Sequence, residues 1–134
     1  MNLALQPARL LLLLVALISS VHAADDFGPL AGTVTVPDGL KVADVQEAII
    51  AGVSARGWAL KNKTNGRIVL SLESGGWRST MTLTYDTKEV KIYSTDSGKP
   101  DKSGVIKKQA IPESWVKYMK QDITKHLGLK AFAK

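Results

Sequence analysis

The 134-residue sequence contains no cysteine, and only 6% of its residues are aromatic. Without cysteine the chain can form no disulfide, thiolate metal site, thiol nucleophile or lipid-modified cysteine. Histidine is almost as scarce, because His126 is the only one after residue 23. A single histidine excludes a Ser-His-Asp triad and a histidine-rich metal site. No carboxylate pair or phosphate-binding glycine loop stands out, so we expect no enzyme activity, no cofactor and no metal.

The first 23 residues have the pattern of a secretory signal peptide. Arg9 supplies the positive charge, Leu10 to Ile18 is an unbroken apolar run, and small residues lead to Ala23. The alternative is a transmembrane anchor, but nine helical residues rise only about 14 Å, roughly half of a hydrocarbon core. We therefore expect cleavage after Ala23, a periplasmic or secreted protein, and no transmembrane anchor after cleavage.

The remaining sequence predicts one small α+β domain at 32–128, between a mobile N-terminal lead at 24–31 and a C-terminal tail at 129–134. Alternating and β-branched residues predict the strands, and Asn65-Gly66 predicts a hairpin with a type I′ turn. The expected strands lie at 33–36, 58–63, 68–72, 77–85 and 89–93. The order β-α-β-β-β-β-α favours an antiparallel sheet of four or five strands with two helices on one face.

Both expected helices carry an apolar stripe with helical spacing. The first is expected over 42–56, and its Gly52 would allow another element to approach closely. The second begins after Ile111-Pro112 and is expected to end at Gly128. Its stripe predicts burial against the sheet and consists of Trp115, Val116, Met119, Ile123 and Leu127.

These features resemble a group of small proteobacterial envelope proteins, many of them predicted lipoproteins. The resemblance rests on Arg56-Gly57-Trp58 closing the first helix, the β-meander, Tyr85-Asp86, Ile92-Tyr93, and Trp115 in a C-terminal helix. The chain departs from the group because it has no cysteine for lipid attachment. It also has Gly98-Lys99-Pro100-Asp101 and Ile111-Pro112-Glu113 where a longer loop with Asn and His would be expected. The resemblance implies the fold and the compartment, and it implies no catalytic residue.

Positive charge is concentrated in the C-terminal part of the chain. Residues 24–85 carry six basic and six acidic residues, whereas residues 86–134 carry eleven lysines and six acidic residues, a net charge of +5. One interpretation is solvated charge for solubility. The other is a surface for an anionic partner, such as lipid headgroups or an acidic envelope protein, with Lys99, Lys102, Lys107 and Lys108 as candidates. Nucleic acid is not expected, because a secreted chain does not meet it and this half lacks arginine.

A second candidate surface is the sheet face that the helices leave open. Arg78, Thr80, Thr82 and Thr84 form a polar strip, and Trp77 lies beside it at a glycine turn, so Trp77 and Arg78 are candidate contacts. The hypothesis is a non-enzymatic binding or accessory module of the cell envelope. The alternative is a small enzyme or enzyme inhibitor that uses the long loop expected at 94–110.

Overall fold

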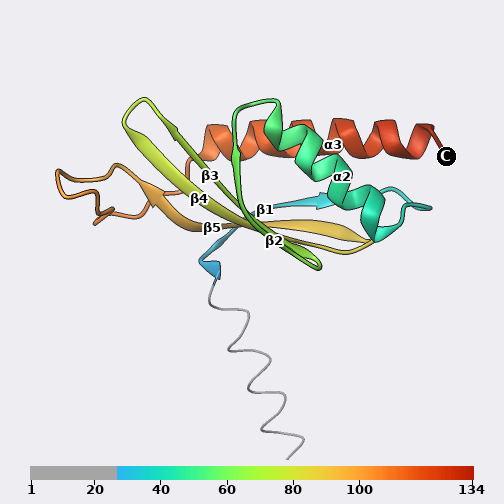
Figure 1. Cartoon of the computed structure of the whole chain (residues 1–134), viewed down its shortest axis with the longest axis horizontal. Helices are drawn as coiled ribbons and strands as arrows, with labels where there is room; N and C mark the ends of the chain where they lie inside the picture. The colour runs from blue at the N-terminus through green and yellow to red at the C-terminus, as the bar shows by residue number, and fades with distance from the viewer. Residues whose placement is uncertain (1–26) are drawn as a thin grey trace, which may run out of the picture.

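The computed structural model describes residues 27–134 (Figure 1). The expected signal peptide, its cleavage point and residues 24–26 lie outside the described residues. The elements are β1 (Leu30–Thr35), α2 (Val42–Ser54), β2 (Ala59–Thr64), β3 (Arg67–Ser74), β4 (Trp77–Tyr85), β5 (Glu89–Gly98) and α3 (Glu113–Phe132). The predicted α+β fold and its β-α-β-β-β-β-α order are confirmed.

The strands form one antiparallel sheet in the order β1-β5-β4-β3-β2. Strands β2 to β5 are a meander because short turns can join only antiparallel neighbours. The connection through α2 carries the chain from β1 at one edge to β2 at the other. The β2–β3 hairpin turns at Asn65-Gly66 as predicted, but only Gly66 has a positive φ, of 78°, so the turn is not type I′.

Both helices lie on the same face of the sheet (Figure 1). The core between them contains Met119 and Ile123 of α3 together with Leu70 and Leu83 of the sheet, as the apolar stripes predicted. Trp115 differs from this expectation, because it is only half-buried at the margin of the core. Its ring packs edge-on against Trp58, with 6.0 Å between the ring centroids.

Gly52 marks the point where the helices cross. A Cβ atom at this position would lie 3.1 Å from the backbone carbon and oxygen of Asp122. The expected close approach is therefore that of α3, and its backbone occupies the space that a larger residue at position 52 would need.

Strand β5 and helix α3 extend beyond their predicted ends. The strand continues to Gly98 because Ser94 and Ser97 are buried, and the Oγ of Ser97 lies 2.7 Å from that of Ser79 on β4. The irregular segment is consequently 99–112 and not 94–110. Helix α3 does not end at Gly128 but continues to Phe132, so most of the expected tail is helical.

The expected lead also differs, because Phe27 packs on the open sheet face and Leu30 and Ala31 belong to β1. The carbonyl of Phe27 accepts a hydrogen bond from Thr95 Oγ1 at 2.8 Å, and the Phe27 ring lies 5.5 Å from that of Tyr93. The guanidinium of Arg67 also lies over the Phe27 ring. The predicted polar strip is therefore not fully open to water, and Thr82 in it is only 3% exposed.

Candidate functional site

Helix α2 covers only the C-terminal part of α3. Its 13 residues rise about 20 Å, whereas the 20 residues of α3 rise about 30 Å. The helices run antiparallel, since Arg56 after the end of α2 pairs with Asp122 in the middle of α3, and Lys134 after α3 pairs with Asp44 in the first turn of α2. The first part of α3, residues 113–121, therefore extends beyond α2 (Figure 1).

Two lysines near the C-terminus, Lys130 in α3 and Lys134 just after it, pair with carboxylates of α2. Lys130 pairs with Glu47, which raises the pKa of the Lys130 ammonium. Lys134 Nζ lies 3.1 Å from Asp44 Oδ2. The pKa of Asp44 is lowered, first by the backbone N–H of Lys41 and then by Lys134. These lysines hold the two helices together and are not free for a partner.

The 99–112 loop lies at the other end of the molecule, beyond the end of β5, and it is ordered by its own polar groups. Asp101 Oδ1 accepts hydrogen bonds from the backbone N–H groups of Ser103 and Val105 and from the Ser103 hydroxyl. The Ser103 hydroxyl is the main reason why the pKa of Asp101 is lowered. The loop folds back close to Gly98, whose φ is 157°. A Cβ at this position would lie 2.6 Å from the carbonyl oxygen of Lys108, so the close approach requires glycine.

The four candidate lysines all lie in this loop with exposed side chains. Lys107 Nζ lies 3.4 Å from Asp101 Oδ2, although its side chain remains 80% exposed. Lys99, Lys102 and Lys108 form no ion pair with any described residue. We define the binding end as the 99–112 loop together with residues 113–121 of α3.

Two further lysines of the binding end were not selected from the sequence. Lys117 and Lys120 on α3 are exposed and also form no ion pair within residues 27–134. The sequence shows that they lie off the apolar stripe of the helix. That they are unpaired depends on the position of α2, whose carboxylates Glu47 and Asp44 pair with Lys130 and Lys134 near the other end of α3.

The predicted contact pair, Trp77 and Arg78, does not form one surface. Neighbouring side chains on a strand point to opposite faces of the sheet, so only one of the two can lie on the open face. Trp77 lines a groove of about 590 Å³ with Trp115 and Ile111. Arg78 donates a hydrogen bond from Nη2 to the carbonyl of Gly104 at 2.8 Å, so it fastens the loop to the sheet.

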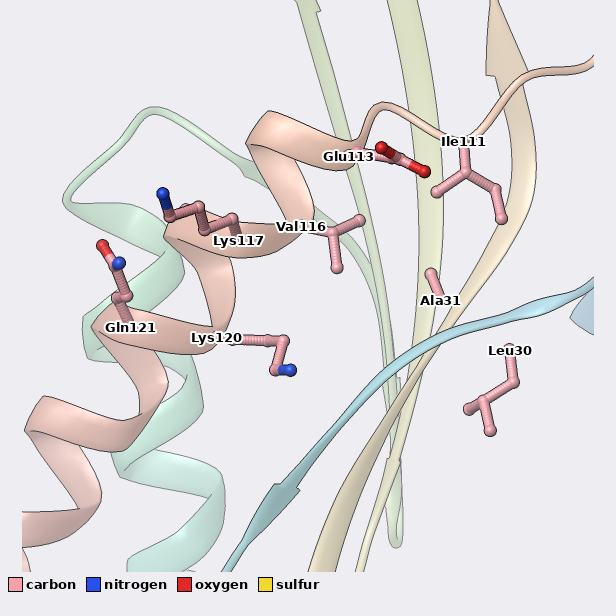
Figure 2. Close-up of a pocket in the computed structure, with 8 residues that line it drawn as sticks. All are labelled: Leu30, Ala31, Ile111, Glu113, Val116, Lys117, Lys120 and Gln121. Carbon is pink, nitrogen blue, oxygen red and sulfur yellow. The ribbon is translucent and has the colours of Figure 1, made fainter.

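A second groove, of about 510 Å³, lies between β1 and the first part of α3 (Figure 2). Leu30 and Ala31 come from β1, and Ile111 closes the end beside the loop. Figure 2 shows Lys120 extending from α3 toward β1. The groove thus has an apolar lining and charged groups along its helical wall, which are Glu113, Lys117 and Lys120.

The side chains of the binding end can attract anionic groups through lysines and pack against apolar groups in the grooves. Asp101 is the one carboxyl of the loop. Its pKa is lowered, and its oxygens accept hydrogen bonds from Ser103 and Val105 and pair with Lys107. Residues 27–134 hold no group of three or more His, Cys, Asp or Glu side chains that could bind a metal ion. Neither described helix has the length and apolar composition of a membrane span.

Comparisons with protein-family models, with curated proteins and with solved structures gave no match. Function must therefore be inferred from the geometry and charge of the site itself.

Proposed function

We propose that the protein is a non-enzymatic binding module of the cell envelope, periplasmic or secreted, which holds an anionic envelope component at its binding end. The observation that carries this proposal is the concentration of exposed, unpaired lysines in one short loop. Lys130 and Lys134 are paired with carboxylates of α2, whereas Lys99, Lys102 and Lys108 are unpaired and exposed within the described chain.

The loop also presents apolar surface among its lysines. Val105 is 53% exposed, and Lys102 and Lys107 lie close to it in sequence. Unpaired ammonium groups attract anionic headgroups over about one Debye length, which is roughly 8–10 Å at moderate ionic strength. An exposed aliphatic side chain adds contact with the acyl boundary at close range. This combination supports a phospholipid surface or a comparable anionic amphiphile as the ligand.

Co-sedimentation with vesicles tests the proposal. The variant changes Lys99, Lys102, Lys107 and Lys108 together to Gln, and the vesicles contain either anionic phosphatidylglycerol or only neutral phosphatidylcholine. We expect the wild type to bind anionic vesicles at low salt and to dissociate as salt rises, and the variant to lose most of this binding.

A charge-matched control distinguishes the effect of the loop lysines on vesicle binding from the effect of the total charge of the protein. It changes Lys61, Lys63, Lys88 and Lys125 to Gln, four exposed lysines outside the binding end that form no described ion pair. The proposal requires this control to bind nearly as well as the wild type. Equal losses in both variants, or no binding by the wild type at low salt, would show that the loop lysines serve solubility.

Export is tested by the intact mass of the protein recovered from the producing cell. The proposal requires a mass that begins at Ala24, because cleavage follows the small residues after the apolar run. A mass that retains Leu10 to Ile18 would contradict cleavage of the signal peptide, and with it the proposed envelope location.

A further inference from the structure

The two edge strands of the sheet differ in how they are protected. Strand β2 carries Lys61 and Lys63, and charged residues, lysine above all, discourage an edge strand from pairing with other chains. Strand β1 has the sequence Leu-Ala-Gly-Thr-Val-Thr, without a charge or a proline. Threonine and valine favour extended structure, so β1 has the composition of a strand that can accept a neighbour.

The outer backbone groups of β1 have no described partner. The strand is the last in the sheet order, and every hydrogen bond described for its backbone is to β5. Alternate residues of an edge strand direct their N–H and C=O groups away from the sheet. This edge also adjoins the groove between β1 and α3, which Leu30 and Ala31 line.

The neighbouring helix supplies charge at the same edge. The Lys120 stem lies against β1, because a Cβ at Gly32 would be 3.0 Å from Lys120 Cδ and 3.3 Å from Val116 Cγ1. Lys117 also lines the groove, but Figure 2 shows its side chain extending away from β1, and Glu113 is the one acidic residue of the lining. The groove therefore has the Lys120 ammonium on the side of β1, the Glu113 carboxylate near Ile111, and an apolar floor.

We infer that β1 accepts an extended segment of a partner protein as a sixth strand. On the face of that segment that meets the groove, at every second residue, apolar and acidic side chains alternate. Main-chain hydrogen bonds to a sheet edge supply affinity in this binding mode, and the neighbouring pockets supply specificity. Charge decides against a second copy of the chain as the occupant. A two-fold pairing of β1 with itself would bring a second Lys120 to the same edge, where like charges oppose each other.

This inference goes beyond the proposed function. It shares Lys117 and Lys120 with the binding end but does not use the four loop lysines that the vesicle experiment changes. The probe is a fluorescein-labelled peptide, Thr-Val-Thr-Glu-Thr-Val-Thr-Glu-Thr, with a comparison peptide that has Lys in place of Glu. Fluorescence polarisation should show saturable binding of the Glu peptide and binding of the Lys peptide weaker by roughly tenfold or more.

Backbone pairing is tested with N-methylated forms of the Glu peptide. Methyl groups on alternate amides block one edge of the peptide, and methyl groups on the other amides block the opposite edge. Strand addition predicts that one form loses binding and the other keeps it. In the protein, binding should slow the hydrogen exchange of outward-facing amides within Leu30–Thr35. Equal binding of the two methylated forms, or unchanged exchange in β1, would overturn the inference.

Matched variants locate the site. Lys117→Glu with Lys120→Glu should weaken binding of the Glu peptide by about tenfold, whereas Lys61→Glu with Lys63→Glu makes the same charge change at the other edge and should have little effect. The four-lysine Gln variant of the loop should keep peptide binding even where it loses vesicle binding. If the two double variants weaken binding equally, the peptide does not bind at β1. A dimer of the free protein whose β1 amides exchange slowly would show that a second copy, and not a partner peptide, is the occupant.

Discussion

The two parts of α3 contain similar residues but have different surroundings. Lys130 in the part covered by α2, and Lys134 just after the helix, meet carboxylates of α2. In the part that extends beyond α2, Lys117 and Lys120 are exposed beside a groove and unpaired in the described structure. The carboxylates of α2 thus pair with lysines near the end of α3, although Lys125 in the covered part is exposed and has no ion pair within residues 27–134.

The largest expected effect comes from deleting core contacts where the two helices cross. Ile123 is 0% exposed, and Ile123→Ala should lower the free energy of unfolding by about 2–5 kcal/mol, through lost burial and a cavity. Ile111, at the binding end, is 38% exposed, and Ile111→Ala should cost about 1 kcal/mol or less. Urea denaturation of both variants measures the contrast. Similar losses would mean that the binding end is as tightly packed as the crossing.

Two glycines provide the next test. Both lie in helices, where replacement by alanine gains up to about 1 kcal/mol from helix propensity. A Cβ at Gly128 meets nothing within 4 Å, so Gly128→Ala should stabilise the protein by that amount. A Cβ at Gly52 would press on the Asp122 backbone, so the cost of overpacking, about 1–3 kcal/mol, should outweigh the gain. Thermal unfolding should shift upward for the first variant and downward for the second. Stabilisation by Gly52→Ala would contradict the close crossing.

The smallest effect concerns acid. The pKa of Asp44 is lowered from 3.8 in the folded protein, so its contribution to stability is present above about pH 4 and is lost as pH falls through the folded pKa. Asp86 and Asp101 have lowered pKa values for a similar reason, because backbone and hydroxyl groups donate to them. Asp44→Asn should therefore lower the melting temperature at pH 7 and leave it nearly unchanged at pH 2. A constant difference across this range would mean that the ionised form of Asp44 does not stabilise the fold.

Element types were predictable because they depend on neighbours in sequence. The period of apolar residues from Val42 to Val53 and from Val116 to Leu127 specified two one-sided helices, and alternation specified the meander. Element ends were less predictable. Ser94 and Ser97 are typical of a loop, yet they lie buried in β5. The Ser94 hydroxyl donates to Ser97, and the Ser97 hydroxyl pairs with Ser79 of β4.

The candidate site shows the same division. The loop lysines could be selected from the sequence because they lie together in it, and their exposure agrees with that selection. Trp77 and Arg78 were grouped because they are adjacent, but strand geometry separates their side chains. Lys117, Lys120 and Leu30 were not grouped, since β1 and α3 meet only after the sheet has formed.

The sequence by itself determined the fold class, the order of the elements, the excess of lysine in the C-terminal part and the absence of cysteine chemistry. Periodicity, composition and turn residues act over a few positions, so they can be read without knowing the neighbours in space. Only the tertiary structure decided which lysines are paired, which sheet edge lacks protecting charge, and where the grooves lie. Those properties depend on contacts between residues far apart in the chain, such as Glu47 with Lys130 and Gly32 with Lys120.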